Sequence, residues 1–326
     1  MPEVPSAPVA DHGPSLPLDA GESLLRRLEL AVRNKLDGLL QGNYQGLVPG
    51  PGSEAGESRP YVAGDDVRRM DWPVTARTLA PHVRQTIADR ELETWLVVDL
   101  SPSMDFGTGL SEKRELVLAA ITAVTHLTVR GGNRVGAIVG NGAQQYRIPA
   151  RAGRAHARHL VRRIAATPRA GAGEQASPEL LAQMLAGLGR PPRRRGMVAV
   201  VSDYLEVVPD GASEPLWART LRGLGQRHQL LGIEVVDPRE LELPALGLIT
   251  FSDPETGRHL EVQTSSRRTR EAYAVAAAHQ RGAISAALRR AGAAHLQLRT
   301  DRDWIADVVR FVVGQRRFVA GVAGGR

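Results

Sequence analysis

Cysteine is absent from this 326-residue sequence, which excludes both a disulfide framework and a thiolate zinc site. Aromatic residues make up only 4% of the chain and are not interleaved with basic residues, so we do not expect sequence-specific nucleic-acid binding despite a formal net charge of +7. No apolar run reaches the roughly 18–20 residues that span a bilayer. Residues 1–20 lack the basic and apolar regions of a signal peptide. We therefore expect a soluble, cytoplasmic protein without a membrane span.

The segment TWLVVDLSPSM, residues 94–104, changes abruptly from apolar to polar. Its continuous apolar run is typical of a buried parallel strand, and the polar residues that follow are Asp99, Ser101 and Ser103. Ligands of open α/β sheets bind at the carboxyl ends of such strands. One carboxylate and two hydroxyls are oxygen ligands that suit a hard cation such as Mg²⁺. The alternative is that Asp99 and the serines only form a turn or cap the next helix.

A second segment, MVAVVSDY at residues 197–204, repeats this pattern and ends in a hydroxyl and an acid, Asp203. Two parallel strands would deliver Asp99 and Asp203 to the same edge of one sheet. Two unpaired carboxylates at close range repel each other unless a cation or a proton lies between them. The repeated pattern therefore predicts a divalent metal site.

A charged block, SRPYVAGDDVRRMDWPVTAR at residues 58–77, precedes the first strand. Aromatic residues among its charges distinguish it from disordered sequence. We expect its acids and arginines to pair and to hold the N-terminal part against the main domain, rather than to act in catalysis. These residues are Asp65, Asp66, Arg68, Asp71 and Arg77.

The pattern YxxGDDxRxxDWxxxAR, followed by a DxSxSM strand, resembles the DUF58 family from about Tyr61 to the C-terminal region. These are prokaryotic proteins that carry a von Willebrand factor A-like domain. The resemblance implies an α/β fold with a doubly wound, mostly parallel, Rossmann-type sheet. It also implies a metal-ion-dependent adhesion site, in which Asp99, Ser101 and Ser103 form the first loop and Asp203 binds through water.

The middle loop of that site normally offers a threonine followed by an aspartate. The corresponding region here is EQASPEL at residues 174–180, so Ser177 either supplies the hydroxyl or only caps the next helix, with a proline after it.

Hydrophobic periodicity and turn residues predict the remaining organisation. We expect four parts: a disordered N-terminus over 1–20, an accessory segment over 21–90, the von Willebrand A-like domain over 91–316 and a tail over 317–326. A β-hairpin insertion is predicted at 248–262, and Asp301 is predicted to cap the closing helix. The other predicted helices cover 21–41, 111–130, 154–165, 177–188 and 266–291, and the other strands cover 134–139, 144–148, 229–236 and 295–298.

These features together indicate a non-enzymatic protein-interaction module that binds an acidic group of a partner through Mg²⁺ or Mn²⁺. The resemblance implies a MoxR-type AAA+ ATPase as partner, a client protein, or both, in the assembly or maturation of protein complexes. A metal-dependent hydrolase or phosphatase is one alternative, although Ser101 occupies the place where haloacid-dehalogenase-like enzymes need a second acid. No GxSxG, GxxxxGKS or HExxH pattern is present. The other alternative is a metal-free scaffold that docks through an arginine-rich face.

Overall fold

The computed structural model describes residues 23, 25–28, 30–32, 58–61, 70, 72–84, 93–130, 132–169, 177, 179–189, 196–206, 208, 214–252 and 259–323. Its central sheet is built from continuous apolar strands, as the sequence predicts, and has six strands in the order β10-β7-β6-β3-β4-β5. All neighbours pair in parallel except β4 and β5, which are antiparallel. The strands are β3 (Glu93–Asp99), β4 (Arg134–Gly140), β5 (Gln145–Arg151), β6 (Gly196–Ser202), β7 (Gln229–Val236) and β10 (Ala293–Arg299).

This strand order confirms the predicted doubly wound α/β class. The chain starts in the middle at β3, runs outward through β4 and β5, and then returns to β6 on the other side of β3. In open sheets of this kind, ligands bind at the point where the order reverses, outside the carboxyl ends of the strands. The reversal here lies between β3 and β6.

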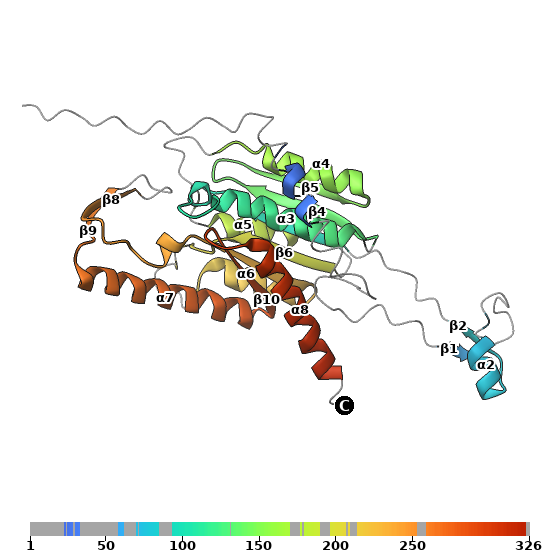
Figure 1. The fold of residues 1–326 in the computed structure, drawn as a ribbon. Coiled ribbons are helices and arrows are strands. Elements are labelled where there is room, and N and C mark those ends of the chain that lie inside the picture. The colour runs from blue at the N-terminus through green and yellow to red at the C-terminus, as the bar shows by residue number, and fades with distance from the viewer. Residues whose placement is uncertain are drawn as a thin grey trace, which may run out of the picture.

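Helices cover both faces of the sheet (Figure 1). In β3, Leu96 and Val98 pack into one buried cluster, while Trp95 and Val97 pack into the other. A strand buried on both faces has no polar side, which is why its sequence does not alternate. The first cluster is covered by α3 (Lys113–Arg130), α4 (Arg154–Ala165) and α8 (Trp304–Ala323), and the second by α5 (Leu180–Ala186), α6 (Leu216–Gly225) and α7 (Arg267–Arg290).

Two predicted hairpins are present in the structure. Asn141 closes the turn between β4 and β5, since its side-chain Oδ1 accepts a hydrogen bond from the Gln144 N–H at 2.8 Å. The insertion forms an antiparallel hairpin of β8 (Leu248–Ser252) and β9 (His259–Gln263) outside the central sheet. The turn that joins these two strands lies outside the described residues.

The start of the closing helix corrects one prediction. Asp303, not Asp301, caps α8, because its Oδ1 accepts a hydrogen bond from the Ile305 N–H at 3.0 Å. Asp301 instead pairs with Arg299 at 2.8 Å. The helix continues to Ala323, beyond its predicted end at residue 314.

The start of α5 also differs from the prediction. The helix begins at Leu180 and ends at Ala186, followed by a short 3-10 turn over Gly187–Gly189. The Leu180 N–H donates to the Ser177 backbone carbonyl at 3.0 Å, and the Leu181 and Ala182 N–H groups donate to the Glu206 carboxylate rather than to the Ser177 side chain. Helix α6 was not predicted at all.

The N-terminal part is described only in pieces. Residues 25–28 and 30–32 are helical, and Leu25, Leu28 and Val32 pack into the same cluster as α3, which agrees with the predicted helix there. Strand β1 (Ser58–Pro60) pairs with β2 (His82–Arg84), and Figure 1 shows this pair and α2 (Trp72–Thr78) apart from the sheet.

Several predictions for this region lie outside the described residues. They concern the N-terminus over 1–20 and the side chains of Asp65, Asp66, Arg68 and Asp71. The four-part division of the chain also stays a prediction. Within the described ranges, no helix combines the length and the hydropathy that a bilayer span requires.

Candidate functional site at the switch point of the sheet

The candidate site begins where β3 ends. After Asp99 the chain enters a 3-10 turn, Pro102–Asp105, in which the Met104 N–H donates to the Ser101 carbonyl at 2.9 Å. Proline fits the first position of such a turn because its missing N–H has no partner there in any case. The turn brings Ser103 back over the carboxyl end of the sheet.

Hydrogen bonds join the two strand ends. Asp99 accepts from the Ser101 N–H at 2.9 Å and from Ser202 Oγ, on β6, at 2.7 Å. Ser103 Oγ donates to Asp203 Oδ2 at 2.8 Å and lies 3.2 Å from Ser101 Oγ. The structure therefore brings Asp99, Ser101, Ser103 and Asp203 together, and their role as metal ligands stays a prediction.

Ser177 serves a local turn. Its Oγ accepts hydrogen bonds from the Glu179 N–H at 3.3 Å and from Gln183 Nε2 at 3.1 Å. Within the described part of the chain, no hydrogen bond joins Ser177 to Asp99, Ser101, Ser103 or Asp203. Its assignment as the third hydroxyl ligand thus has no support from the geometry.

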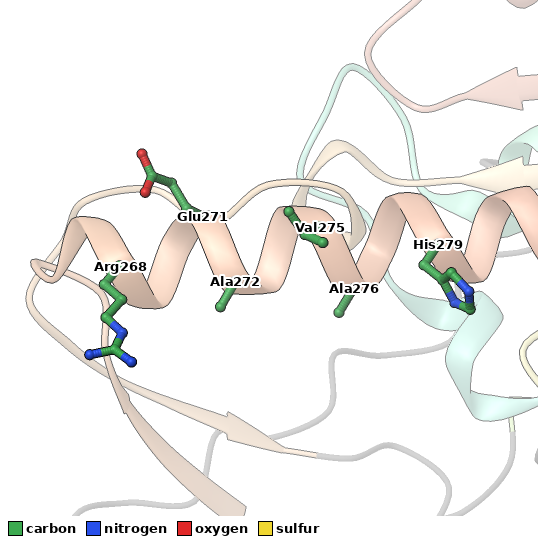
Figure 2. Close-up of a pocket in the computed structure, with 6 residues that line it drawn as sticks. All are labelled: Arg268, Glu271, Ala272, Val275, Ala276 and His279. Atoms are coloured by element: carbon green, nitrogen blue, oxygen red, sulfur yellow. The ribbon is translucent and has the colours of Figure 1, made fainter.

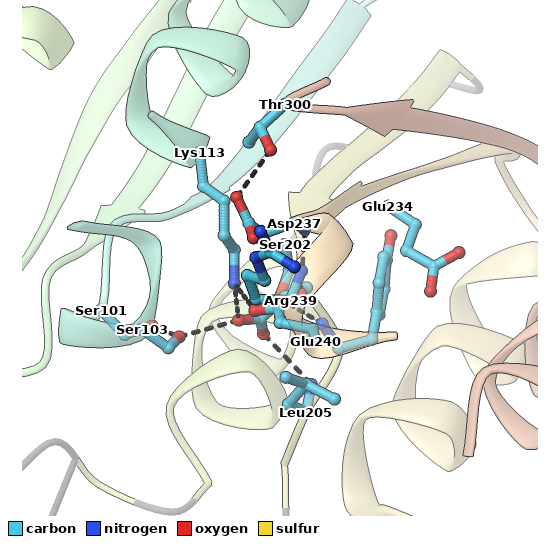
Figure 3. A network of polar contacts seen from close by, with 12 residues as sticks. Ser101, Ser103, Lys113, Ser202, Leu205, Glu234, Asp237, Arg239, Glu240 and Thr300 are labelled. Carbon is cyan, nitrogen blue, oxygen red and sulfur yellow. Dashed lines mark hydrogen bonds and ion pairs between the residues drawn. The ribbon is translucent and has the colours of Figure 1, made fainter. Parts of the chain in front are cut away.

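A lysine that the sequence analysis did not single out contacts the same carboxylate as Ser103. Lys113 is the first residue of α3, and its side chain is fully buried. Its Nζ donates to Asp203 Oδ2 at 2.7 Å and to Glu240 Oε1 at 2.6 Å. Figure 3 shows Lys113 and Glu240 within this network of polar contacts. Asp203 is therefore already paired with one positive charge.

The polar network continues along the sheet edge beyond Lys113. Arg281, from α7, pairs with Glu240 at 2.9 Å and with Glu234, on β7, at 3.1 Å. Its NH1 also donates to the Asp203 backbone carbonyl at 3.0 Å. His295, on β10, lies 2.9 Å from Glu234. We call this set the edge network; it comprises Asp99, Ser101, Ser103, Lys113, Asp203, Glu234, Glu240, Arg281 and His295.

Asp237 holds the loops around the edge network in place. Its carboxylate accepts hydrogen bonds from the Thr108 N–H at 2.7 Å, from Thr108 Oγ1 at 2.6 Å and from Thr300 Oγ1 at 2.6 Å. These donors hold the pKa of Asp237 below its usual value although burial acts in the opposite direction. The loop after β3 is thus fastened to the ends of β7 and β10.

The two central carboxylates have opposite pKa shifts. Burial raises the pKa of Asp99, and the nearby Asp203 raises it further. Burial also opposes ionisation of Asp203, but the Lys113 ammonium and the Ser103 hydroxyl outweigh it and lower its pKa. The pKa of Lys113 is raised, since Asp203 and Glu240 outweigh the effect of its burial. Of these two carboxylates, Asp99 is the one whose charge its surroundings compensate less.

The donor atoms suit a hard cation. Neighbouring ligand oxygens around an octahedral Mg²⁺ lie about 2.8–3.0 Å apart. The Ser101 and Ser103 hydroxyl oxygens are 3.2 Å apart, close to this spacing. In the described residues no ion pair reaches Asp99, so a cation there would relieve its buried charge.

Also among the described residues, no cluster of three or more histidine, cysteine, aspartate or glutamate residues is placed to hold a metal. Any ion here thus depends on Asp99 and hydroxyls.

The comparisons with known proteins establish the family. The family described as "Protein of unknown function DUF58" matches residues 57–283. The chain belongs to the DUF58 family. Uncharacterized proteins of Mycobacterium tuberculosis and Mycobacterium bovis are each 51% identical over 318 residues, which covers 95% of this chain and 96% of theirs.

Solved structures show more distant likenesses to this DUF58 chain. The protein BatB from Bacteroides thetaiotaomicron aligns with 12% identity and a TM-score of 0.41, over 69% of this chain and 99% of BatB. The SpRpn10 VWA domain aligns with 11% identity and a TM-score of 0.37, over 67% of this chain and 93% of that domain. The doubly wound α/β fold of the DUF58 chain is shown by its own sheet order, β10-β7-β6-β3-β4-β5.

A hollow along the outer face of α7 is a weaker candidate for the functional site of this DUF58 protein (Figure 2). Half of its lining residues are small or apolar, and Val275 is 71% exposed. Glu271 pairs with Arg267 at 2.6 Å along the same exposed face. Because its polar groups do not converge on a point, this hollow offers a ligand little specificity. The hollow is lined by Arg268, Glu271, Ala272, Val275, Ala276 and His279.

The sequence contains only weak indications of the edge-network residues that were not predicted. A lysine in the first turn of a helix opposes the helix dipole, which favours acids there, so Lys113 indicated a nearby carboxylate. Glu234 is a single charge within an otherwise apolar strand and needs a buried partner. Neither pattern indicates which residue is the partner. Arg281 gave no signal, because it lies in a long helix rich in exposed arginines.

Proposed function

We propose that this DUF58 protein is a non-enzymatic protein-interaction module that docks partners at the carboxyl edge of its sheet, between β3 and β6. The observation that supports this proposal is the convergence of Asp99, Ser101, Ser103 and Asp203 at that edge. These residues come from two strand ends that are 100 residues apart in the sequence. A turn or helix cap would require only one of the two segments.

A divalent cation, Mg²⁺ or Mn²⁺, is the proposed ligand of this edge. Asp99, Ser101 and Ser103 would hold it directly, and Asp203 would contribute through water. A bound cation supplies an open coordination position that attracts a carboxylate of the partner. Neutral serine hydroxyls leave much of the positive charge of the ion uncompensated, which favours an acidic partner group.

The proposed partner is a MoxR-type AAA+ ATPase, with or without a client protein, in the assembly or maturation of protein complexes. This partner follows from the DUF58 membership alone. It would place the protein in the cytoplasm.

Binding between the purified full chain and a purified MoxR-type ATPase tests this function. We expect binding in Mg²⁺ that is lost with chelator and lost in Asp99→Asn, which removes the charge but keeps the shape. The experiment is done without nucleotide, so that chelation does not act through the ATPase. Asp301→Asn, an exposed carboxylate paired with Arg299, is the matched control and should bind like the wild type.

The possible results separate the alternatives. Absence of binding in Mg²⁺ would overturn the ATPase partner. Binding that is unchanged by chelator and by Asp99→Asn would overturn the proposed metal dependence and favour the metal-free scaffold. The Lys113–Asp203 contact makes this scaffold the stronger of the two alternatives.

The hydrolase alternative gains no support. Among the described residues, the hydrogen bonds to Asp99 come from Ser101 and Ser202, and neither supplies the general acid that a phosphotransferase of this kind needs. Metal-dependent turnover of a generic phosphate ester would reverse this judgement.

A further inference from the structure

The position of Lys113 would affect the affinity of the candidate site for a divalent cation. The side chain has no exposure to solvent, and its Nζ lies between two carboxylates, 2.7 Å from Asp203 Oδ2 and 2.6 Å from Glu240 Oε1. A lysine amine that is fully buried keeps its charge only when carboxylates surround it. The site therefore carries a fixed positive charge of its own.

This charge lies close to the place of the proposed divalent ion. Ser103 Oγ and Lys113 Nζ both contact Asp203 Oδ2, at 2.8 and 2.7 Å. An ion bound to Ser103 Oγ would lie within about 8 Å of Nζ. Like charges at this distance repel, and burial limits the screening that salt provides.

Lys113 also contacts the carboxylate that would reach the divalent ion through water. Asp203 Oδ2 already accepts from Lys113 Nζ and from Ser103 Oγ. Arg281 differs, because it reaches only the backbone carbonyl of Asp203 and pairs with Glu234 and Glu240 instead. Of Lys113 and Arg281, only Lys113 contacts a side-chain carboxylate of the candidate site.

We propose that Lys113 is a built-in cation that competes with a divalent ion at Asp99, Ser101 and Ser103. The carboxylate of Asp203 is satisfied without metal, and the affinity of the site for divalent ions is set low by the neighbouring ammonium. The inference rests on the metal site of the proposed function, but it concerns the lysine and is tested separately. Its consequence is that removal of the ammonium should strengthen metal binding.

Titration of the purified full chain with Mn²⁺, followed by electron paramagnetic resonance of the free ion, measures this effect. We expect Lys113→Met to bind Mn²⁺ about tenfold more tightly than the wild type or better, because one repelling charge is gone and Asp203 is released. Lys113→Arg keeps the charge and should bind like the wild type. Arg281→Met, the matched removal of a largely buried cation further along the edge network, should have a smaller effect.

Lys113→Met leaves the buried Asp203 carboxylate without its cation and leaves the Glu240 carboxylate with Arg281 alone, which is a risk to folding. The double variant Lys113→Met/Glu240→Gln removes one of these charges and serves as the second test, with near-ultraviolet circular dichroism as the check of the fold. Asp99→Asn in the Lys113→Met background should abolish the gained binding, which assigns that binding to the candidate site.

The possible outcomes distinguish failure of the lysine proposal from failure of the proposed function. If folded Lys113→Met and the double variant bind Mn²⁺ no better than a wild type that binds, the lysine proposal is overturned and the metal site stands. If only the variants without the lysine bind, the lysine proposal is supported and metal-dependent docking by the native protein is overturned. If no variant binds Mn²⁺ at millimolar concentration, both are overturned.

Discussion

Glu206 connects the candidate site to helix α5. It follows Asp203 by three residues, and its carboxylate accepts hydrogen bonds from the Leu181 and Ala182 N–H groups at the start of the helix. Burial, with smaller contributions from Asp99 and Glu179, raises the pKa of Glu206 from 4.5 to about 7. The helix start is thus held by a carboxyl group that titrates near neutral pH.

This raised pKa makes stability depend on pH. Between about pH 4.5 and 7 the folded protein binds more protons at Glu206 than the unfolded chain does, so the free energy of unfolding falls as pH rises through this window. Glu206→Gln cannot ionise, and its amide oxygen can still accept from Leu181. We expect the variant to be more stable than the wild type at pH 8 by about 1–3 kcal/mol, with the difference lost near pH 4.5. Urea denaturation at both pH values measures it.

Glu179→Gln is the control, since Glu179 is an exposed glutamate at the same helix start. It should leave the pH dependence nearly unchanged. Equal pH dependence in the wild type and in Glu206→Gln would contradict the role assigned to Glu206.

At the scale of elements, the contact between β3 and β6 places the two acidic strand ends side by side. The strands pair from Glu93 opposite Gly196 to Val98 opposite Val201. At the far end of this pairing, a Cβ atom on Gly196 would lie 1.9 Å from the Glu93 carbonyl oxygen. Glycine is therefore required there by the close approach of the two backbones.

Gly196→Ala should push β6 away from β3, because the clashing atom belongs to the backbone and cannot rotate away. We expect a loss of at least about 2 kcal/mol in the free energy of unfolding. Gly223→Ala in α6 is the matched control, since a Cβ there meets no atom within 4 Å. It should instead stabilise the protein by about 0.5–1 kcal/mol, as alanine does in an exposed helix. Chemical denaturation of both variants checks the pair, and wild-type stability of Gly196→Ala would refute the close approach.

At the scale of the whole molecule, a ligand that binds only the folded chain raises its stability. If the candidate site binds Mg²⁺ with a dissociation constant of about 1 mM, 10 mM Mg²⁺ adds about 1.4 kcal/mol to the free energy of unfolding. The melting temperature should then rise by about 2–4 °C, as measured by calorimetry. Asp99→Asn should lose this rise.

The same variant should melt higher than the wild type in the absence of metal at pH 7.5. Burial and the nearby Asp203 disfavour the charge on Asp99, and the variant removes that charge. Asp301→Asn is the control and should keep the response to Mg²⁺. A Mg²⁺ response that survives in Asp99→Asn would place the binding elsewhere on the molecule.

The sequence alone determined the class of the fold and the position of the two central acids. Continuous apolar runs specify strands that are buried on both faces, and parallel strands bring their carboxyl ends to one edge of the sheet. Asp99 and Asp203 therefore lie at the same edge, as the sequence predicted. Both signals are local, because a strand or a turn is encoded within a few residues. The Asn141 turn was predicted for the same reason.

Only the tertiary structure decided what compensates the charges at that edge. Lys113 contacts Asp203 and Glu240 across 90 and 127 residues of sequence, and no local pattern encodes such a pairing. The predictions of two helix caps were wrong for the same reason. Helix α5 is capped by Glu206 from the loop after β6, and Asp301 pairs with Arg299 instead of capping α8. Periodicity states which residues are buried, but the partner of a buried charge depends on which elements the fold packs together.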